Sequence, residues 1–450
     1  MPSLVLTNAL IINEQRRFYA DVLIQHGRIS QIARTISARP TWQVYDLAGK
    51  WLIPGMIDSQ VHFREPGLMH KGTIASESAA AVRGGVTSFM EMPNVMPPTT
   101  SHQALEDKFS RAAGVSWANY SFYFGATQDN VEALKRLAPG AACGVKVFMG
   151  ASTGNMLVDD EKVLAAIFQH APGLVATHCE HTPTIRQNEA RWRAWFGEDI
   201  PAEEHASIRS VEACLRSTSL AISLASQYHT RLHVLHISTA EELELFRALP
   251  TSGTDGAKNI SAEACVHHLY FNRQDYAVLG HRLKCNPSVK EARHQQALWR
   301  AVNEGVIDII ATDHAPHLLS EKQLPYFSAP SGLPLVQHAL PALLDLSQRG
   351  IFTPECIVQK TSHAVADRFS LKDRGYIREG YWADLAVIDP SQRHCVRPGS
   401  SAYLCGWSPF EGREFNGGVI DKTLINGQLV WNGQSLQGQP CGRALDFYSS

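Results

Sequence analysis

The stretch WLIPGMIDSQVHFR, residues 51–64, contains an apolar run that ends in the polar side chains of Gln60, His62 and Arg64. Side chains alternate between the two faces of a β-strand, so residues two positions apart share a face. The stretch therefore predicts a buried strand whose polar end belongs to a site. A histidine at position 60 would complete an H-x-H pair with His62, but this chain has glutamine there.

The same pattern recurs along the middle of the chain, where apolar runs alternate with segments of helical periodicity. Such alternation predicts a parallel sheet, and eight repeats over roughly 250–300 residues match an α/β fold, the (β/α)8 TIM-type barrel. A doubly wound open sheet is the alternative, but no G-x-G-x-x-G motif follows the first strand. The eight predicted strands lie at residues 51–62, 86–94, 120–127, 144–150, 173–181, 231–238, 259–268 and 306–317.

Both ends of the chain have a different sequence pattern. Apolar and polar residues partly alternate there in short segments that are separated by Gly and Asn. We expect residues 1–53 and 376–450 to form one small β-sandwich together. Residues 54–375 then form the barrel, which we expect to carry the chemistry.

Composition excludes several classes of function. The 450-residue chain is 44% hydrophobic and has a net charge of −2, so it lacks the basic field that binds nucleic acid or an anionic membrane. Its nine cysteines include no C-x-x-C pair, which argues against a disulfide framework and fits a reducing cytoplasm. We also find no signal peptide and no apolar run near the ~20 residues that span a bilayer. We therefore expect a cytoplasmic protein.

Metal-binding and titratable residues gather at the ends of the predicted strands. The carboxyl ends of barrel strands converge on one mouth, where active sites lie. Each residue alone is more often a polar cap or turn residue, but their joint occurrence favours a metal site. Imidazole nitrogen and carboxylate oxygen suit zinc. The strand-end residues are Gln60, His62, Arg64, Asn94, Lys146, His178, His236, Asp313, His314 and His317.

Lys146 lies inside the apolar segment GVKVFMG, residues 144–150. A buried ammonium without a partner costs roughly several kcal/mol of folding free energy. Either the lysine reaches the surface or an ion-pair partner, or its pKa is lowered and it reacts with CO2 to form a metal-bridging carbamate. Arg64 also has two interpretations: it forms an ion pair with Glu65, or it binds a planar ligand through two parallel hydrogen bonds. We interpret His267 and His268 as structural.

Seven motifs together resemble the signature set of dihydroorotases in the amidohydrolase superfamily. "REPG" and "KVFMGASTGNML" resemble the dihydroorotase branch in particular, and the resemblance runs over nearly the whole chain. The motifs are PGMIDSQVHFREPG, MPNVMPPTT, GVKVFMGASTGNML, THCEH, LHISTA, CNPSVK and IATDHAPH.

The resemblance implies a barrel with a small β-sandwich, and one or two Zn²⁺ ions held by His62, His178, His236, Asp313 and a carboxylated Lys146. It implies that Arg64 grips the substrate carboxylate, helped by Asn94, Asn286 and His317, and that Asp313 transfers the proton. The implied reaction is the reversible closure of N-carbamoyl-L-aspartate to L-dihydroorotate, a step of pyrimidine (UMP) biosynthesis. By the same analogy we expect a homodimer, and we expect residues 318–332 to help close the site.

Two positions depart from the resemblance. Most of the family has histidine in place of Gln60, so either one metal is weak or absent, or the amide oxygen or a water takes the place of the imidazole. Lys290 replaces an arginine. The alternatives are a related ring-opening enzyme (dihydropyrimidinase or allantoinase), or a catalytically silent paralogue that acts as a structural partner of aspartate transcarbamoylase.

Overall fold

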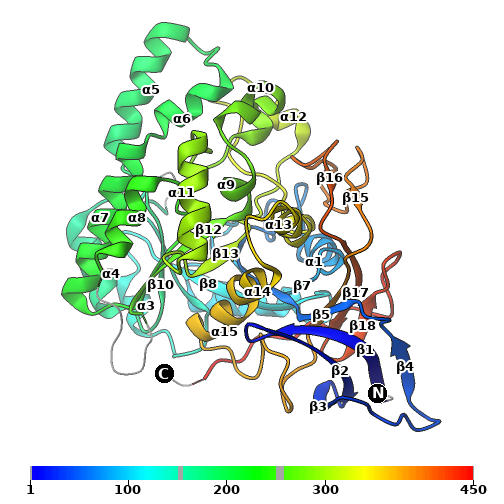
Figure 1. Ribbon diagram of the computed structural model, residues 1–450. Helices are drawn as coiled ribbons and strands as arrows, with labels where there is room; N and C mark the ends of the chain where they lie inside the picture. The colour runs from blue at the N-terminus through cyan, green and yellow to red at the C-terminus, as the bar shows by residue number, and fades with distance from the viewer. Residues whose placement is uncertain (1–2, 151–155, 250–257, 449–450) are drawn as a thin grey trace.

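A parallel barrel of eight strands forms the centre of the computed structural model, which describes residues 3–150, 156–249 and 258–448 (Figure 1). The strands follow one another around the sheet in chain order. Each predicted strand overlaps one of them, which confirms the predicted fold class. They are β6 (Met56–Val61), β7 (Val86–Glu91), β8 (Asn119–Gly125), β9 (Gly144–Phe148), β10 (Val175–His178), β11 (Leu232–Val234), β12 (Ile260–Cys265) and β13 (Ile309–Ala311).

Helices surround the barrel and connect its strands (Figure 1). Helix α5 extends away from the barrel and buries only Thr184 and Ile185. The helices are α1 (Ile74–Arg83), α2 (His102–Ala112), α3 (Val131–Lys135), α4 (Glu161–His170), α5 (Thr182–Phe196), α6 (His205–Ile208), α7 (Val211–Tyr228), α8 (Ala240–Arg247), α9 (Val266–Tyr270), α10 (Tyr276–Leu279), α11 (Ala292–Asn303), α12 (Leu319–Lys322), α13 (Ala339–Gln348), α14 (Pro354–Val358) and α15 (Ala364–Arg368).

Several of these helices begin at an N-cap that the sequence supplies. The side chains of Thr73, Asp160 and Thr239 each accept a hydrogen bond from a backbone N–H in the first turn of α1, α4 and α8. Such caps satisfy donors that have no partner inside the helix, and each contributes about 1 kcal/mol. The caps therefore fix where the strand-to-helix loops at the barrel mouth end.

The two ends of the chain meet in a second, mostly antiparallel sheet, seen in Figure 1 as blue strands beside red ones. The N-terminal and C-terminal parts join where β5 pairs antiparallel with β14. Leu6, Val22, Leu385 and Leu424 belong to its separate core. The strands are β1 (Leu4–Asn13), β2 (Arg16–Gln25), β3 (Arg28–Ala33), β4 (Gln43–Asp46), β5 (Trp51–Pro54), β14 (Leu385–Asp389), β17 (Val419–Ile425) and β18 (Gln428–Trp431), and a short ribbon, β15 (His394–Cys395) with β16 (Glu414–Phe415), lies apart from them.

The barrel closes between its first and last strands. The backbone N–H of His62 donates to the carbonyl of His314 at 2.7 Å. The buried carboxyl group of Asp58 accepts hydrogen bonds from Thr312, at 3.2 Å from the backbone nitrogen and 2.6 Å from Oγ1. These contacts bring the polar ends of β6 and β13 together.

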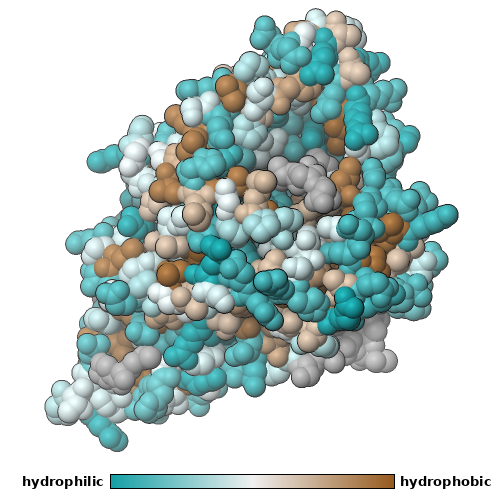
Figure 2. All heavy atoms as spheres, turned by 180° about the vertical axis from the view of Figure 1, so that it is seen from behind, coloured by the Kyte–Doolittle hydropathy of each residue, from teal (hydrophilic) through white to brown (hydrophobic). Residues whose placement is uncertain are grey.

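Polar side chains cover most of the face shown in Figure 2, and hydrophobic ones occur there in small, separate groups. Among the described residues, no helix is both long and apolar enough to cross a membrane.

We expect the substitution Thr312→Val to destabilise the fold by about 1–3 kcal/mol, because it removes a hydrogen bond from a buried carboxyl group. The shift in the guanidinium chloride unfolding midpoint measures the effect. Thr41→Val is the matched control, since Thr41 is exposed. An equal midpoint for both variants would contradict the assigned role of the Asp58–Thr312 contact.

Candidate active site

Ten of the eleven residues named for the site line a single pocket at the barrel mouth; His314 is not in this lining, and its Nε2 lies 2.9 Å from Glu77 Oε2. The strand ends supply most of them, as the geometry of parallel strands requires. Phe148, Arg209, Ala315 and residues 330–332 complete the lining. The predicted residues in the lining are Gln60, His62, Arg64, Asn94, Lys146, His178, His236, Asn286, Asp313 and His317.

His62 faces Asp313 across the closing edge of the barrel. The Asn94 side-chain oxygen lies 2.7 Å from His62 Nδ1, so it accepts the proton of that nitrogen. The Nε2 lone pair then faces Asp313 Oδ1 at 3.1 Å. Burial lowers the pKa of His62, which favours its neutral form. Two facing lone pairs of this kind suit a bound cation.

A second pair of facing nitrogens belongs to His178 and His236, whose Nδ1 and Nε2 atoms are 3.0 Å apart. His178 Nε2 donates to the buried carboxylate of Glu180 at 2.9 Å, which leaves Nδ1 with its lone pair. Burial lowers the pKa of both histidines. Metal-binding histidines in proteins commonly have one ring N–H held by a carboxylate in this way.

Lys146 is buried in the same pocket as the His62–Asp313 and His178–His236 pairs. It forms no hydrogen bond or ion pair with any described residue, although its Nζ lies 4.6 Å from the centre of the Phe148 ring. Burial lowers its pKa to about 8, while Asp313 and Glu263 counteract this effect from longer range. A neutral amine is the form that reacts with CO2, so the geometry suits the predicted carbamate.

Gln60 presents its amide nitrogen, and not its oxygen, to the predicted metal ligand. Nε2 donates to Asp313 Oδ1 at 3.0 Å, and Oε1 accepts from the Cys265 thiol at 3.7 Å. The side chain therefore acts as a hydrogen-bond donor to the carboxylate, in competition with a cation at the same oxygen.

Asp313 remains acidic despite its burial. Burial alone would raise its pKa, but the charge of Lys146, together with the hydrogen bond and charge of His62 and the charge of His267 when these rings are protonated, holds the pKa below its usual value. Asp313 and the site residues Arg64 and His236 also have positive φ angles of 53°, 71° and 40°. Backbone strain of about 1–3 kcal/mol per residue is typical of functional sites.

Arg64 is held by the segment that follows β13, and it does not pair with Glu65. Its Nε donates to the Pro316 carbonyl at 3.1 Å, and its Nη2 lies 3.0 Å from His317 Nε2. Glu65 instead accepts from the backbone N–H of Ile74. Burial lowers the pKa of Arg64 to about 10, and Asp313, Glu91 and Glu321 act on it only from longer range. The pocket therefore holds a guanidinium with no carboxylate in contact among the described residues.

Residues 318–332 border the pocket through Pro330, Ser331 and Gly332. The Ser331 carbonyl lies 3.1 Å from His317 Nε2, and Lys71 donates to His317 Nδ1 at 3.1 Å. The Asn286 side-chain oxygen is buried without a hydrogen-bond partner in the described part of the chain. An unpaired acceptor of this kind suits a substrate N–H group.

Glu180 and Arg209 are site residues that the sequence prediction did not include. Arg209 Nη1 donates to Glu180 Oε2 at 2.6 Å. Burial would raise the pKa of Glu180, but Arg209 and His178 hold it down at about 2. Glu180 follows His178 at i+2 in THCEH and could have been inferred from that spacing, whereas the segment around Arg209 carries no signal.

Residues 51–430 match the amidohydrolase family model. The chain is 30% identical to a dihydroorotase from Methanosarcina mazei, over 98% of this chain and 96% of that protein. It is 32% identical to an allantoinase from Rubrobacter xylanophilus, over 94% and 93% of the two chains. Among solved structures, an L-hydantoinase (dihydropyrimidinase) from Arthrobacter aurescens has a TM-score of 0.91 at 24% identity, covering 99% and 100%.

We expect Glu180→Gln to weaken Zn²⁺ binding by about 10- to 100-fold, because a neutral amide no longer fixes the proton and orientation of His178. Competition with a chromogenic chelator measures the affinity. The control is Glu198→Gln, which alters an exposed ion pair with Arg193. An unchanged affinity in Glu180→Gln would contradict the role assigned to the Glu180–His178 hydrogen bond.

The variant Gln60→His should raise the bound metal by about one equivalent per chain, since an imidazole replaces the donor that occupies Asp313 Oδ1. Elemental analysis after loading with Zn²⁺ gives the metal content, and Gln103→His, at an exposed position, controls for adventitious binding by an added histidine. If Gln60→His binds no more metal than the wild type, the amide at this position does not limit occupancy.

Proposed function

The chain belongs to the amidohydrolase family and is a hydrolase of cyclic amide C–N bonds, and from this premise we propose that it is a dihydroorotase. It would interconvert N-carbamoyl-L-aspartate and L-dihydroorotate in pyrimidine biosynthesis. Similarity to dihydroorotases over nearly the whole chain supports this proposal.

The guanidinium of Arg64, which contacts no carboxylate among the described residues, is the observation that carries the proposal. L-Dihydroorotate differs from hydantoin, dihydrouracil and allantoin by a carboxylate on the ring. Arg64 is only 6% exposed, so its charge is largely removed from water. A substrate carboxylate would supply the missing partner through two parallel hydrogen bonds. His317, which contacts Arg64 Nη2, would border the same carboxylate.

We propose Zn²⁺ as the metal, because the donor set fits it. His178, His236 and carboxylated Lys146 would hold one ion, and His62, Asp313 and the same lysine would hold a second, weaker one. When bound, the metal lowers the pKa of water and polarises the substrate carbonyl.

The other side chains bind the substrate and move the proton. Arg64, Asn94, Asn286 and His317 would fix the ring so that the amide carbonyl lies near Asp313. In the hydrolytic direction Asp313 accepts the proton of the attacking water and returns it to the ring nitrogen as the C–N bond breaks. Its Oδ2 has no hydrogen-bond partner among the described residues, so the atom is free for this transfer. Ring closure uses the same groups in reverse.

Two alternatives have an observation in their favour. Similarity to an allantoinase favours a cyclic amide without a carboxylate. The hydrogen bond from Gln60 to Asp313 favours a silent paralogue, because it occupies an oxygen that a metal would use. Turnover of L-dihydroorotate by the Zn²⁺-loaded protein separates them: no turnover of any cyclic amide supports the silent paralogue, and turnover of allantoin or dihydrouracil alone supports the first alternative.

We expect Arg64→Ala to lower kcat/KM for L-dihydroorotate by about 100-fold or more, because the substrate loses both its anchor and its orientation. Arg64→Lys should recover only part of the loss, since an ammonium lacks the planar fork. Steady-state hydrolysis measures both effects. Arg111→Ala, which removes an exposed ion pair with Asp107, should remain at the wild-type rate. Full activity of Arg64→Ala towards L-dihydroorotate would refute the proposed substrate.

A further inference from the structure

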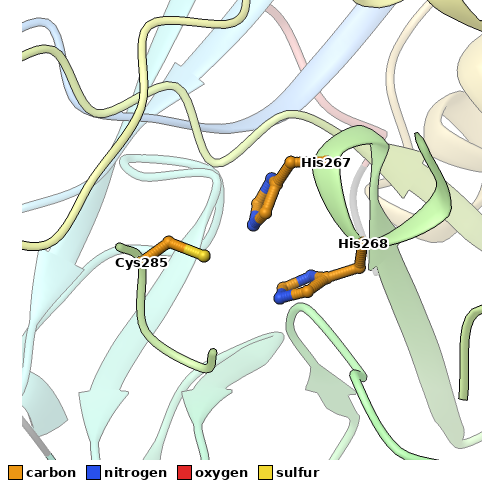
Figure 3. Close-up of side chains that lie close together, drawn as sticks. All are labelled: His267, His268 and Cys285. Atoms are coloured by element: carbon orange, nitrogen blue, oxygen red, sulfur yellow. The ribbon is translucent and has the colours of Figure 1, made fainter. Parts of the chain in front are cut away.

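Three buried side chains beside the pocket form a cluster that the proposed function does not use. His267 and His268 lie in the first turn of α9, directly after β12, and Cys285 lies in the segment before α11. Figure 3 shows the two imidazoles and the thiol turned toward a common space. Among the described residues, one ligand atom from each lies within 4.8 Å of the other two. None of the three side chains is more than 3% exposed.

The hydrogen bonds of this His-His-Cys cluster are incomplete. His268 Nε2 donates to the Pro287 carbonyl at 3.0 Å, which leaves the lone pair on Nδ1, and Nδ1 has no partner in the described part of the chain. Neither ring nitrogen of His267 has a hydrogen-bond partner there either. Each buried, unsatisfied polar group costs about 1–3 kcal/mol, and native structures leave few of them.

Both imidazoles are in the form that binds metals. Burial lowers the pKa of His267 to about 4, although Asp313 and the Thr312 backbone act in the opposite direction, and burial lowers the pKa of His268 further. Both rings are therefore neutral near pH 7. The second ring nitrogen of His268 is already held by a carbonyl, as is usual for metal-binding histidines.

We propose that His267, His268 and Cys285 bind one thiophilic d10 cation, with Zn²⁺ as the physiological ion, at a site separate from the active-site ligands. Two neutral nitrogens and one thiolate are a donor set that selects such ions. With Zn–N near 2.0 Å and Zn–S near 2.3 Å, the ligand atoms of a tetrahedral site lie about 3.3–3.6 Å apart. The three ligand atoms, which lie within 4.8 Å of one another, would move closer together when the ion binds.

Binding exchanges a proton for the metal. Burial raises the pKa of the Cys285 thiol to about 12, so the group is protonated before the ion arrives. The S–H bond breaks, the sulfur–metal bond forms, and the proton leaves to solvent, so the site changes in charge by +1. The carboxylate of Asp313, which already acts on His267, partly offsets this charge.

The position of the cluster gives the ion a structural role. It would tie α9 to the segment that contains Cys285, and Asn286, the predicted substrate residue with an unpaired oxygen, comes next in the chain. The ion would also add one metal per chain regardless of Gln60. A total of two metals would then not by itself mean two metals at the active site.

X-ray absorption on the Zn²⁺-loaded full-length protein tests the proposal without a variant. We expect a sulfur neighbour near 2.3 Å, amounting to about one sulfur per chain and less than one per zinc, because the predicted active-site ligands are nitrogen and oxygen only. A spectrum with nitrogen and oxygen neighbours alone would overturn the proposal and leave the cluster as packed core histidines, whose ring centres are 4.0 Å apart.

Variants then assign the sulfur. In the Co²⁺-loaded protein, the thiolate-to-cobalt absorption band should disappear in Cys285→Ser, and the bound metal should fall by about one equivalent. Cys265→Ser is the matched control, because Cys265 is equally buried and its thiol lies 3.7 Å from the Gln60 side-chain oxygen. A band that persists in Cys285→Ser, or that disappears in Cys265→Ser, would refute the assignment. If Cys285→Ser does not fold, His268→Asn should lose the same equivalent, and a full complement of metal would refute the site.

Discussion

The contact between the first and last barrel strands is the constraint on which the site depends. His62 and Asp313 lie 251 positions apart in the chain, yet closure of the barrel places their side chains in contact. The same closure sets Arg64 against the Pro316 carbonyl. The buried carboxyl group of Asp58 accepts two hydrogen bonds from Thr312 at this edge. These bonds fix the alignment of β6 with the end of β13.

The barrel mouth concentrates cations that the protein itself does not neutralise. Lys146 and Arg64 are both buried without a carboxylate in contact among the described residues. Burying a charge that has no partner costs roughly several kcal/mol of folding free energy. Under the proposed function, a substrate carboxylate would pair with Arg64, and reaction with CO2 would convert Lys146 from a cation into an anionic carbamate.

Sequence motifs predicted the strand-end residues well because a parallel barrel converts position along the chain into position in space. Gln60, Lys146 and His236 needed only the strand pattern to be assigned to the mouth. Arg209 could not be predicted in this way, because it reaches Glu180 from a short helix within a long strand-to-strand connection. The proximity of Cys285 to His267 and His268 could not be predicted either, because it depends on how a loop lies against α9.

By itself, the sequence determined the class of the fold and the kind of chemistry: eight alternating strands and helices predict a parallel barrel with one site at its converging strand ends, and the motifs resemble those of cyclic amidohydrolases. Only the tertiary structure decided which atoms meet. It turned the Gln60 amide nitrogen toward Asp313, left Arg64 without a contacting carboxylate among the described residues, and placed two histidines beside a cysteine. The physical reason is that periodicity fixes the face on which a side chain lies, whereas its hydrogen-bond partners depend on the packing of segments that are remote in the chain.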